Sequence, residues 1–315
     1  MQLPVLRIGN LVPKYPIIQG GMSIKVSTSS LAAAVARAGG IGVIGGTGIT
    51  LEELKNEIQT ARTTANGGIL GVNIMFAAHQ FKDMVQTAIN ECIDVIFTGA
   101  GFSRDIFEMG KKGGVPIVPI VSSARAARLA ERCGAAAVVA EGTEAGGHLG
   151  TDRSIKEILP EIKEAVKIPV VAAGGIVNGF DMAEMIKLGA DGIQMATRFV
   201  LSEECSVADA YKQVYLNATE DDIVIVKSPV GMPGRAIRNK FSELMEKTAE
   251  PPKTKCNHCL KQCSHVYCIT QALLQARNGN VDKGLVFAGK NVFKIKDILP
   301  VEKIFQNILS EYATS

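Results

Sequence analysis

Pro169-Val-Val-Ala-Ala-Gly-Gly-Ile176 is the stretch of sequence that decides the fold. It is apolar on both faces and ends in two glycines, as expected for a buried parallel strand followed by a tight turn. Seven other short apolar runs share this pattern, which gives predicted strands at 16–20, 40–44, 69–75, 94–98, 116–121, 136–140, 169–173 and 192–196. Eight units spaced about 25 residues apart predict a (β/α)8 barrel of the α/β class. A doubly wound sheet is the alternative, but it would need fewer units or an open edge.

The segments between these runs have the periodicity of amphipathic helices. We expect helices over residues 30–38, 51–60, 81–92, 123–133, 155–166 and 181–188. Thr50 followed by Glu53 predicts a capping box at the start of one helix. Gly134 and Gly189 follow helix ends, where glycine is common. Strands that alternate with helices in this way support the barrel.

The regular alternation stops near residue 220, so we predict a barrel over 1–220 and an appendage over 221–315. The appendage begins with a strand-like run and a turn-rich stretch, followed by a charged helix and a break at Pro251-Pro252. A cysteine cluster at 256–268 and two more helices follow. Because its own core would be small, we expect this helical, cysteine-containing appendage to close over the barrel mouth.

Composition and charge exclude several classes of protein. The 315 residues include 34 Lys and Arg against 31 Asp and Glu, and this net charge of +3 argues against binding to nucleic acid or to a membrane surface. No apolar run is long enough to span a membrane, and the N-terminus lacks the pattern of a signal peptide. Seven cysteines, four of them clustered, form a poor disulfide framework. A cytoplasmic protein is therefore expected.

The active site of a barrel lies at the C-terminal ends of its strands. Gly174 and Gly175 follow the seventh predicted strand, and Met195, Ala196 and Thr197 end the eighth. Backbone N–H groups at these two ends, together with the Thr197 hydroxyl, would suit one phosphate group. The alternative is that the glycines only permit tight turns between strand and helix. Two such segments on adjacent strands favour a phosphate site.

His148 is the candidate for proton transfer. It follows two glycines on the loop after the sixth predicted strand, near Glu141 and Glu144. A lone histidine is often structural, but the glycines would leave this imidazole accessible. The sequence has no Walker loop, HExxH motif or convincing catalytic triad, so hydrolase and kinase functions have little support. Acid–base chemistry beside a phosphate-bearing cofactor fits better.

Several motifs at these strand ends closely resemble one family. They are Tyr15-Pro-Ile-Ile-Gln-Gly-Gly-Met22, Gly71-Val-Asn-Ile-Met75, Thr98-Gly-Ala-Gly101, Ala140-Glu-Gly-Thr-Glu-Ala-Gly-Gly-His148, Pro169 to Ile176, Gln194-Met-Ala-Thr-Arg-Phe199 and Gly234-Arg-Ala-Ile-Arg-Asn-Lys-Phe241. The 2-nitropropane dioxygenase-like family is the one that they resemble. It contains nitronate monooxygenases and the flavin-dependent enoyl-[acyl-carrier-protein] reductase II. The family fold is a flavin-binding (β/α)8 barrel.

The resemblance implies that FMN binds non-covalently at the mouth of the barrel. It places Gly21 and Met22 against the isoalloxazine ring, and it implies a hydrogen bond from Asn73 to the ring system. The residues that the resemblance further assigns to the cofactor are Ser122, Glu141, Gly174, Gly175, Gln194, Met195, Ala196 and Thr197. His148 matches the family histidine that exchanges a proton with the substrate. Family members commonly have Gly where this chain has Ala196, which is tolerable only if φ is negative there.

Two chemistries of the family remain open. One is NAD(P)H-dependent reduction of an activated C=C bond, as in an enoyl thioester on a small molecule or an acyl carrier, and the other is oxidation of a nitronate with dioxygen. The motifs around residues 19–22, 144–150 and 235–239 look more like enoyl reductase II, which suggests a role in fatty acid biosynthesis. A non-catalytic flavin-binding protein is a minor alternative. A relative of inosine-monophosphate dehydrogenase would need a loop cysteine between Cys133 and Cys205, and none is present.

The cysteine cluster departs from the family. Cys256, Cys259, Cys263 and Cys268 could bind zinc or a [4Fe–4S] cluster, since four thiolates suit either. Alternatively, the first three form a stripe of small residues on one helix. A homodimer is possible, since the alanine-rich helices could support one.

Overall fold

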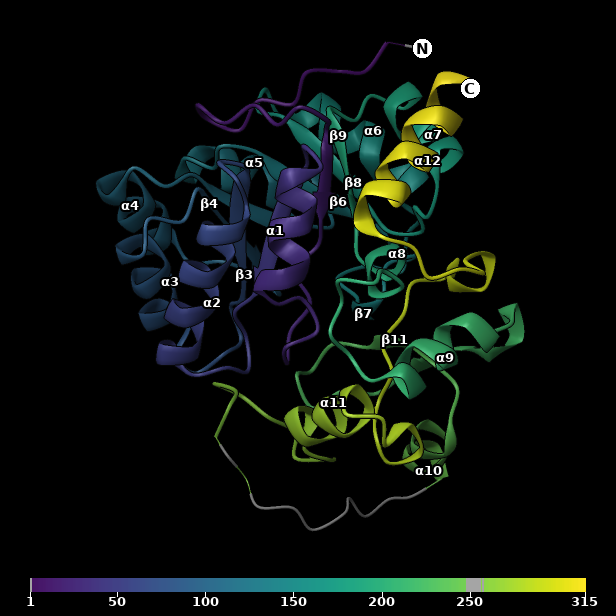
Figure 1. Cartoon of the computed structure of the whole chain (residues 1–315). Coiled ribbons are helices and arrows are strands. Elements are labelled where there is room, and N and C mark those ends of the chain that lie inside the picture. Colours follow the sequence, from purple (N-terminus) through teal and green to yellow (C-terminus); the bar gives the residue numbers. More distant parts are fainter. Residues whose placement is uncertain (1, 248–255, 257) are drawn as a thin grey trace.

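The computed structural model describes residues 2–247, 256 and 258–315, so the predicted break at Pro251-Pro252 lies outside the described residues. Eight parallel strands form a closed barrel, in which the last strand pairs with the first (Figure 1). The strands are β1 (Ile17–Gln19), β2 (Ile41–Gly45), β3 (Ile69–Met75), β4 (Val95–Gly99), β5 (Ile117–Val121), β6 (Val138–Glu141), β8 (Val170–Ala173) and β9 (Gly192–Met195). The (β/α)8 prediction is confirmed, and each predicted strand overlaps an observed one.

Helices surround the barrel and cover the outer faces of its strands. They are α1 (Ser29–Arg37), α2 (Leu51–Thr64), α3 (Phe81–Asn90), α4 (Arg104–Gly113), α5 (Ala124–Cys133), α6 (Ile155–Ala165), α7 (Gly179–Lys187) and α8 (Thr197–Val200). The predicted capping box of Thr50 and Glu53 starts α2. Helix α4 was not among the predicted helices, because Gly110 and Gly113 weaken its pattern.

Two apolar layers hold this part of the molecule together. The barrel interior is filled by alternate strand residues such as Val43, Phe97 and Val171, all of them buried. Leu6 and Ile8 from the N-terminal segment join this inner cluster. A larger cluster lies between the strands and the surrounding helices. The barrel is therefore a packed core and not a pore, which leaves a site only at the strand ends.

The rest of the chain adds a small sheet and further helices. The sheet is antiparallel and joins β7 (Gly147–His148) with β10 (Ile223–Val226) and β11 (Gly234–Ile237). The added helices are α9 (Asp209–Asn217), α10 (Lys240–Lys247), α11 (Ile269–Arg277), α12 (Val301–Ala313) and the 3-10 turns η1 (Glu220–Asp222), η2 (Val281–Lys283) and η3 (Val292–Lys294). In Figure 1, α9, α10 and α11 lie below the barrel. Helix α12 returns to the barrel wall, where the Gly179 N–H at the start of α7 donates to Glu311 (2.7 Å).

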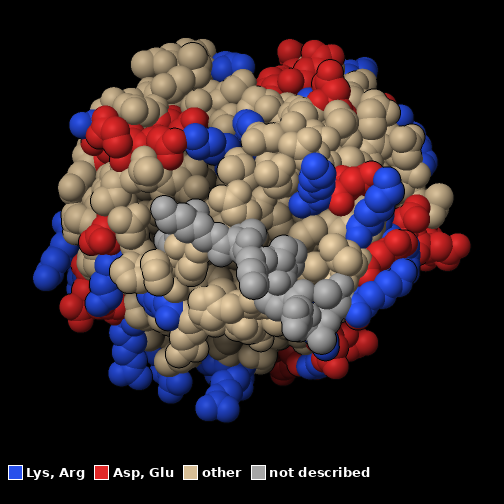
Figure 2. Space-filling model, turned by 90° about the horizontal axis from the view of Figure 1, so that it is seen from below, with Lys and Arg blue, Asp and Glu red and all other residues tan. Residues whose placement is uncertain are grey.

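No helix in the described part of the chain is long and apolar enough to cross a membrane. On the face seen in Figure 2, the basic and acidic side chains of the described residues lie mainly around the edge.

Candidate functional site

A cavity of about 1120 Å³ lies where the strand ends of the barrel meet the C-terminal region. Nine of the predicted site residues line it, namely Gly21, Met22, Asn73, Ser122, Glu141, His148, Gln194, Ala196 and Thr197. They come from the ends of five different barrel strands or the segments that follow them. Among the other predicted site residues in the described part of the chain, Gly174, Gly175 and Met195 lie outside the lining, as do three of the four clustered cysteines.

The ends of β1 and β3 meet tightly at Gly21. A Cβ atom added to Gly21 would lie 2.4 Å from the Asn73 Cβ and 2.9 Å from Val43, so no other residue fits without movement. The Asn73 side chain donates from Nδ2 to the Gly21 carbonyl (3.0 Å). Its Oδ1 atom is buried and has no hydrogen-bond partner among the described residues. A buried acceptor in a cavity wall is costly unless a ligand satisfies it.

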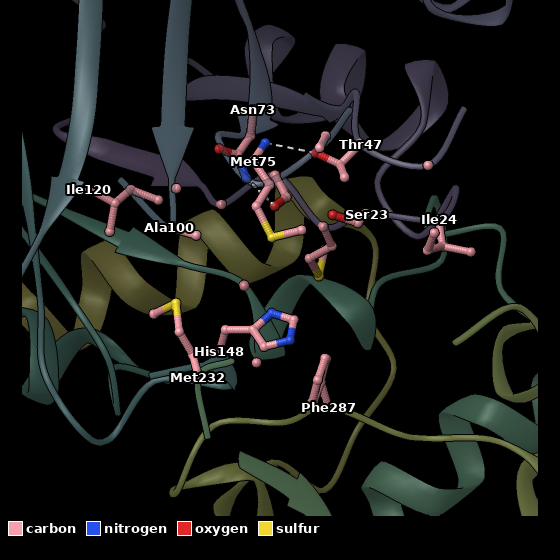
Figure 3. Close-up of a pocket in the computed structure, with 18 of the residues that line it drawn as sticks. Ser23, Ile24, Thr47, Asn73, Met75, Ala100, Ile120, His148, Met232 and Phe287 are labelled. Atoms are coloured by element: carbon pink, nitrogen blue, oxygen red, sulfur yellow. Dashed lines mark hydrogen bonds between the residues drawn. The ribbon is translucent and has the colours of Figure 1, made fainter. Parts of the chain in front are cut away.

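His148 reaches the cavity from the small sheet and not from a free loop. Residue pairs Gly234–His148 and Arg235–Gly147 join β11 to β7, and Arg235 donates from Nε and Nη2 to the Thr143 carbonyl (3.1 and 2.8 Å). The His148 Nε2 atom is hydrogen-bonded to Ser228 Oγ (2.7 Å). The edge of its ring packs against Phe287, with ring centroids 5.1 Å apart. Figure 3 shows the imidazole near Met232 and Phe287, below Asn73 and Met75.

Burial changes the titration of two cavity-lining groups in opposite ways. It lowers the pKa of His148 to about 4, because the apolar surroundings disfavour the imidazolium ion. It raises the pKa of Glu141 to about 7, because the carboxylate is removed from water. The Glu141 side chain has no hydrogen bond or ion pair within the described residues. At neutral pH the site thus holds a neutral histidine together with a glutamate that titrates near this pH.

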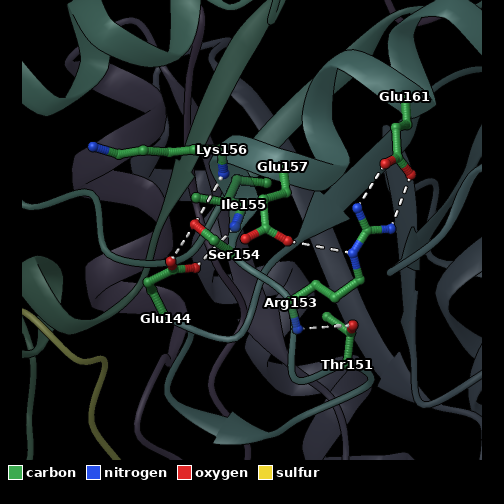
Figure 4. Close-up of polar contacts among 8 residues, drawn as sticks. All are labelled: Glu144, Thr151, Arg153, Ser154, Ile155, Lys156, Glu157 and Glu161. Carbon is green, nitrogen blue, oxygen red and sulfur yellow. Dashed lines mark hydrogen bonds and ion pairs between the residues drawn. The ribbon is translucent and has the colours of Figure 1, made fainter.

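The loop between β6 and α6 is held in place by a polar network. Glu144 accepts hydrogen bonds from Ser154 Oγ (2.6 Å) and from the Ile155 N–H (3.0 Å) at the start of α6 (Figure 4). Arg153 forms a bidentate pair with Glu161 further along the helix. This network fixes both ends of the loop that carries β7 and His148. The carboxylate of Glu144 therefore has a structural role in holding this loop.

The ends of β8 and β9 carry the residues for which a phosphate site is predicted. Gly174 and Gly175 have φ angles of 107° and 73°, which other residues adopt only with strain. Thr197 Oγ1 accepts from the Gly289 N–H (2.9 Å), which leaves the hydroxyl proton free to donate. The short helix α8 begins at Thr197, and the N–H groups of Phe199 and Val200 both donate to the Ala196 carbonyl (2.9 and 3.2 Å). Ala196 has a φ of −116°, so the methyl group at this position is tolerated.

The cysteine-containing segment docks beside the cavity mouth. The His79 N–H donates to the Cys259 carbonyl (3.0 Å), and the Lys261 N–H donates to Ala77 (2.9 Å) in the loop between β3 and α3. The described residues of 256–268 form no helix, so the helical stripe is wrong. Among residues 2–247, 256 and 258–315, no three His, Cys, Asp or Glu side chains are placed to bind a metal. The metal site expected at Cys256, Cys259, Cys263 and Cys268 is therefore unsupported.

Sequence reasoning missed several residues that complete the site. They are Thr47, Tyr211, Tyr215, Ser228, Met232 and Phe287, all of which line the cavity or contact His148. Ser228 and Phe287 lie 80 and 139 positions after His148 in the chain. Ser228 lies in the turn-rich stretch that follows the strand-like run of the appendage, but nothing in the pattern of this stretch indicates which side chain turns inward.

Comparisons with known proteins agree with this geometry. A family model described as nitronate monooxygenase matches residues 7–311. The (3aS,4S,5R,7aS)-5-hydroxy-7a-methyl-1-oxo-octahydro-1H-indene-4-carboxyl-CoA dehydrogenase of Mycobacterium tuberculosis is 34% identical over 74% of this chain, and the match spans 66% of that protein, just under two thirds. A probable nitronate monooxygenase of Staphylococcus aureus is 30% identical over 74% of this chain and 78% of its own length.

Solved structures extend the likeness to nearly the whole chain. FabK from Thermotoga maritima has a TM-score of 0.86 at 32% identity and covers 96% of this chain and 94% of its own. Nitroalkane oxidase from Streptomyces ansochromogenes has a TM-score of 0.82 at 25% identity, with 96% of each chain covered. The expected resemblance to a family of oxidoreductases is thus confirmed, and this chain belongs to the nitronate monooxygenase family.

Proposed function

We propose that this chain is an FMN-dependent oxidoreductase that uses NAD(P)H to reduce an activated C=C bond, as in an enoyl thioester. Two of its relatives support a thioester substrate, since one is named as a carboxyl-CoA dehydrogenase and FabK is of the enoyl reductase type that the motifs resemble. The observation that carries the proposal is the size and lining of the cavity, which extends well beyond the glycine-rich strand ends.

The residues at the strand ends fit FMN. The unpaired Oδ1 of Asn73 and the space kept open at Gly21 suit the ring system, and the free Thr197 proton and the turn at Gly174 and Gly175 suit the phosphate. When bound, FMN supplies the transfer of a hydride equivalent between nucleotide and substrate. Metal chemistry has no part in this proposal, because the clustered cysteines are not brought together in the described residues.

The outer part of the cavity suits a hydrocarbon chain. Apolar side chains from the barrel loops face others from the C-terminal region; they are Ile24, Val26, Ile49, Met84, Leu260, Ile269 and Leu273. Burial of apolar substrate surface here would contribute about 25 cal/mol per Å². A small nitronate would leave this space unfilled, whereas the acyl chain of a thioester would occupy it.

His148 and Glu141 supply the proton chemistry. His148 is neutral near pH 7, so it can take a proton from a substrate carbon in the oxidative direction; in the reductive direction it must first take up a proton, which it then gives to the substrate carbon. Glu141 titrates near pH 7 in the same cavity and can hold the proton that the reaction consumes. Both groups are partly buried in the cavity wall, and a bound substrate would further limit their exchange with solvent during turnover.

Steady-state assays with a series of trans-2-enoyl thioesters test the proposal. The FMN-loaded protein should oxidise NADH or NADPH in step with formation of the saturated thioester, and longer chains should have lower KM values. The series should stop improving once the chain exceeds the apolar part of the cavity. NAD(P)H oxidation without any saturated product would contradict the proposal.

Nitronate oxidation with dioxygen is the second candidate. The similarity to a probable nitronate monooxygenase and to nitroalkane oxidase favours it, as does a neutral histidine that can act as a base towards a nitroalkane. Oxygen uptake with alkyl nitronates in the absence of NAD(P)H measures this activity directly. A rate above that of enoyl thioester reduction would make it the main function.

A further inference from the structure

The loop that follows β4 leaves several backbone N–H groups without acceptors. After β3 the ladder continues beyond the strand, since the Phe76 N–H donates to the Gly99 carbonyl at the end of β4 (2.9 Å). After β4 the ladder stops, and the N–H groups of Ala100, Gly101 and Phe102 have no acceptor among the described residues. These donors lose hydrogen bonds when a ligand displaces water from the loop, unless the ligand supplies an acceptor.

The free donors face the large cavity at the strand ends. Strands β4 and β5 separate beyond the pair of Thr98 and Pro119, and the residues on both sides of this gap line the cavity, namely Gly99, Ala100, Gly101, Phe102, Ile120, Val121 and Ser122. Because the Gly99 carbonyl points to the loop after β3, the trans peptide directs the Ala100 N–H the opposite way, toward the gap. In Figure 3, Ala100 lies at the strand ends, with His148 and Met232 below it.

The backbone of this loop is strained and firmly held. Ala100 has a φ of 55°, in the left-handed region that a residue with a Cβ atom adopts only at a cost in free energy. Before the loop's partner residue in α3, Phe76 packs edge-on against Phe81, with ring centroids 5.2 Å apart. Phe102 packs in the same way against Phe107 in α4, at 5.6 Å. These contacts hold the donors in place before a ligand binds, as an electrostatic site requires.

We propose that the backbone N–H groups of Ala100 and Gly101 form an oxyanion site that binds the carbonyl oxygen of the substrate thioester. The inference rests on the proposed function. Hydride addition to the β-carbon of an enoyl thioester forms a C–H bond and breaks the C=C π bond, so negative charge develops on the carbonyl oxygen until the α-carbon takes a proton. Fixed donors at that oxygen stabilise the developing charge. His148 lines the same cavity, so one substrate can present its α-carbon to His148 and its carbonyl oxygen to the loop.

Isotope-edited infrared difference spectroscopy of the full-length, FMN-loaded protein tests the site without turnover. A trans-2-enoyl-CoA labelled with carbon-13 at its carbonyl is bound in the absence of NAD(P)H, so it is not reduced. In the wild type we expect the carbonyl band at a lower frequency than for the same thioester in water, because two fixed donors polarise the C=O bond more than water does. A band at or above the frequency in water would overturn the proposal.

Gly101→Ala should return the band toward its frequency in water. Gly101 has a φ of 101°, and an added Cβ would lie 3.2 Å from the Phe76 ring, so the loop must shift and the donors lose their alignment. Re-oxidation of the reduced flavin by the thioester should slow on the order of 10²-fold, the effect of removing one oxyanion donor. Flavin reduction by NAD(P)H and the affinity for FMN should stay unchanged.

Gly189→Ala is the matched control, since Gly189 has the same φ of 101° and a similar nearest contact, 3.4 Å to Lys163, outside the cavity lining. It should change neither the band nor the rate. Weaker FMN binding in Gly101→Ala with an unchanged carbonyl band would overturn the proposal and assign the donors to the flavin. The wild-type band decides the matter even if Gly101→Ala fails to fold. A shifted band for a thioester that NAD(P)H does not reduce would support the binding site and contradict the proposed function.

Discussion

The barrel rim and the C-terminal region contribute to the same cavity in different ways. The rim offers backbone and small side chains at Gly21, Ala196 and Thr197, which are placed by short segments that directly follow the strands. The C-terminal region offers the surroundings of His148, through Ser228 and Phe287, which are distant in sequence. In the proposed function, the FMN site is therefore built locally by the barrel, whereas the setting of the proton-transfer candidate depends on contacts with residues distant in sequence.

Loss of the His148 imidazole should have the largest effect. His148→Gln removes the proton-exchanging group, and we expect kcat/KM for enoyl thioester reduction to fall about 10²- to 10⁴-fold. The affinity for FMN, measured by flavin fluorescence, should change little because the rim is intact. A comparable loss of FMN binding would erase the distinction between the two regions.

Gly21→Ala should damage the rim and leave the C-terminal region intact. The added Cβ would lie 2.4 Å from the Asn73 Cβ, so we expect FMN to bind about tenfold or more weakly and the protein to lose about 1–3 kcal/mol of stability. Fluorescence titration and denaturant unfolding measure the two effects. Gly99→Ala is the control, since its nearest contact would be an ordinary 3.7 Å to Ile120. Equal FMN affinity in the two variants would contradict the proposal that the space kept open at Gly21 holds part of the FMN ring system.

Opposed pKa shifts predict opposite dependences of stability on pH in two variants. Glu141 titrates near 7 in the folded protein and near 4.5 when unfolded, so its contribution to the free energy of unfolding falls by about 3 kcal/mol as pH rises across that window. His148 shifts from 6.5 to about 4, so its contribution rises by about 3 kcal/mol between pH 4 and 6.5. The two contributions largely cancel in the wild type.

Each single variant should reveal the pH dependence of stability that comes from the group it retains. In flavin-free Glu141→Gln, the free energy of unfolding should increase from pH 4 to 6.5, and in His148→Gln it should decrease from pH 4.5 to 7. Urea unfolding at several pH values measures both slopes. Parallel slopes in the two variants would show that the site does not bury both groups.

Lys261 should have the smallest effect, because it only anchors the docked segment. Its Nζ donates to the Phe76 carbonyl (2.6 Å) and lies 3.9 Å from the centroid of the Phe76 ring. Lys261→Ala should weaken substrate binding by at most about 1 kcal/mol. This corresponds to a KM up to about fivefold higher with kcat unchanged. Lys261→Arg should restore the wild-type KM. A large fall in kcat instead would mean that docking also sets the catalytic geometry.

The same comparison explains what could be predicted from the sequence. The barrel strands and rim residues follow from local patterns, such as the apolar run and paired glycines from Pro169 to Ile176. Gly147 and His148 show no strand pattern, because β7 exists only through pairing with β11. The segment at 256–268 has a helix-like spacing of cysteines, yet its described residues dock as an extended loop through backbone bonds to Ala77 and His79. Such contacts depend on the complete fold.

An anaerobic titration of the FMN-loaded protein with NADH and NADPH tests the central claim most directly. We predict that one nucleotide bleaches the flavin absorption band, and that a trans-2-enoyl thioester then restores the band as the saturated thioester forms. A flavin that neither nucleotide reduces, but that a nitronate does reduce, would contradict the proposed reductase.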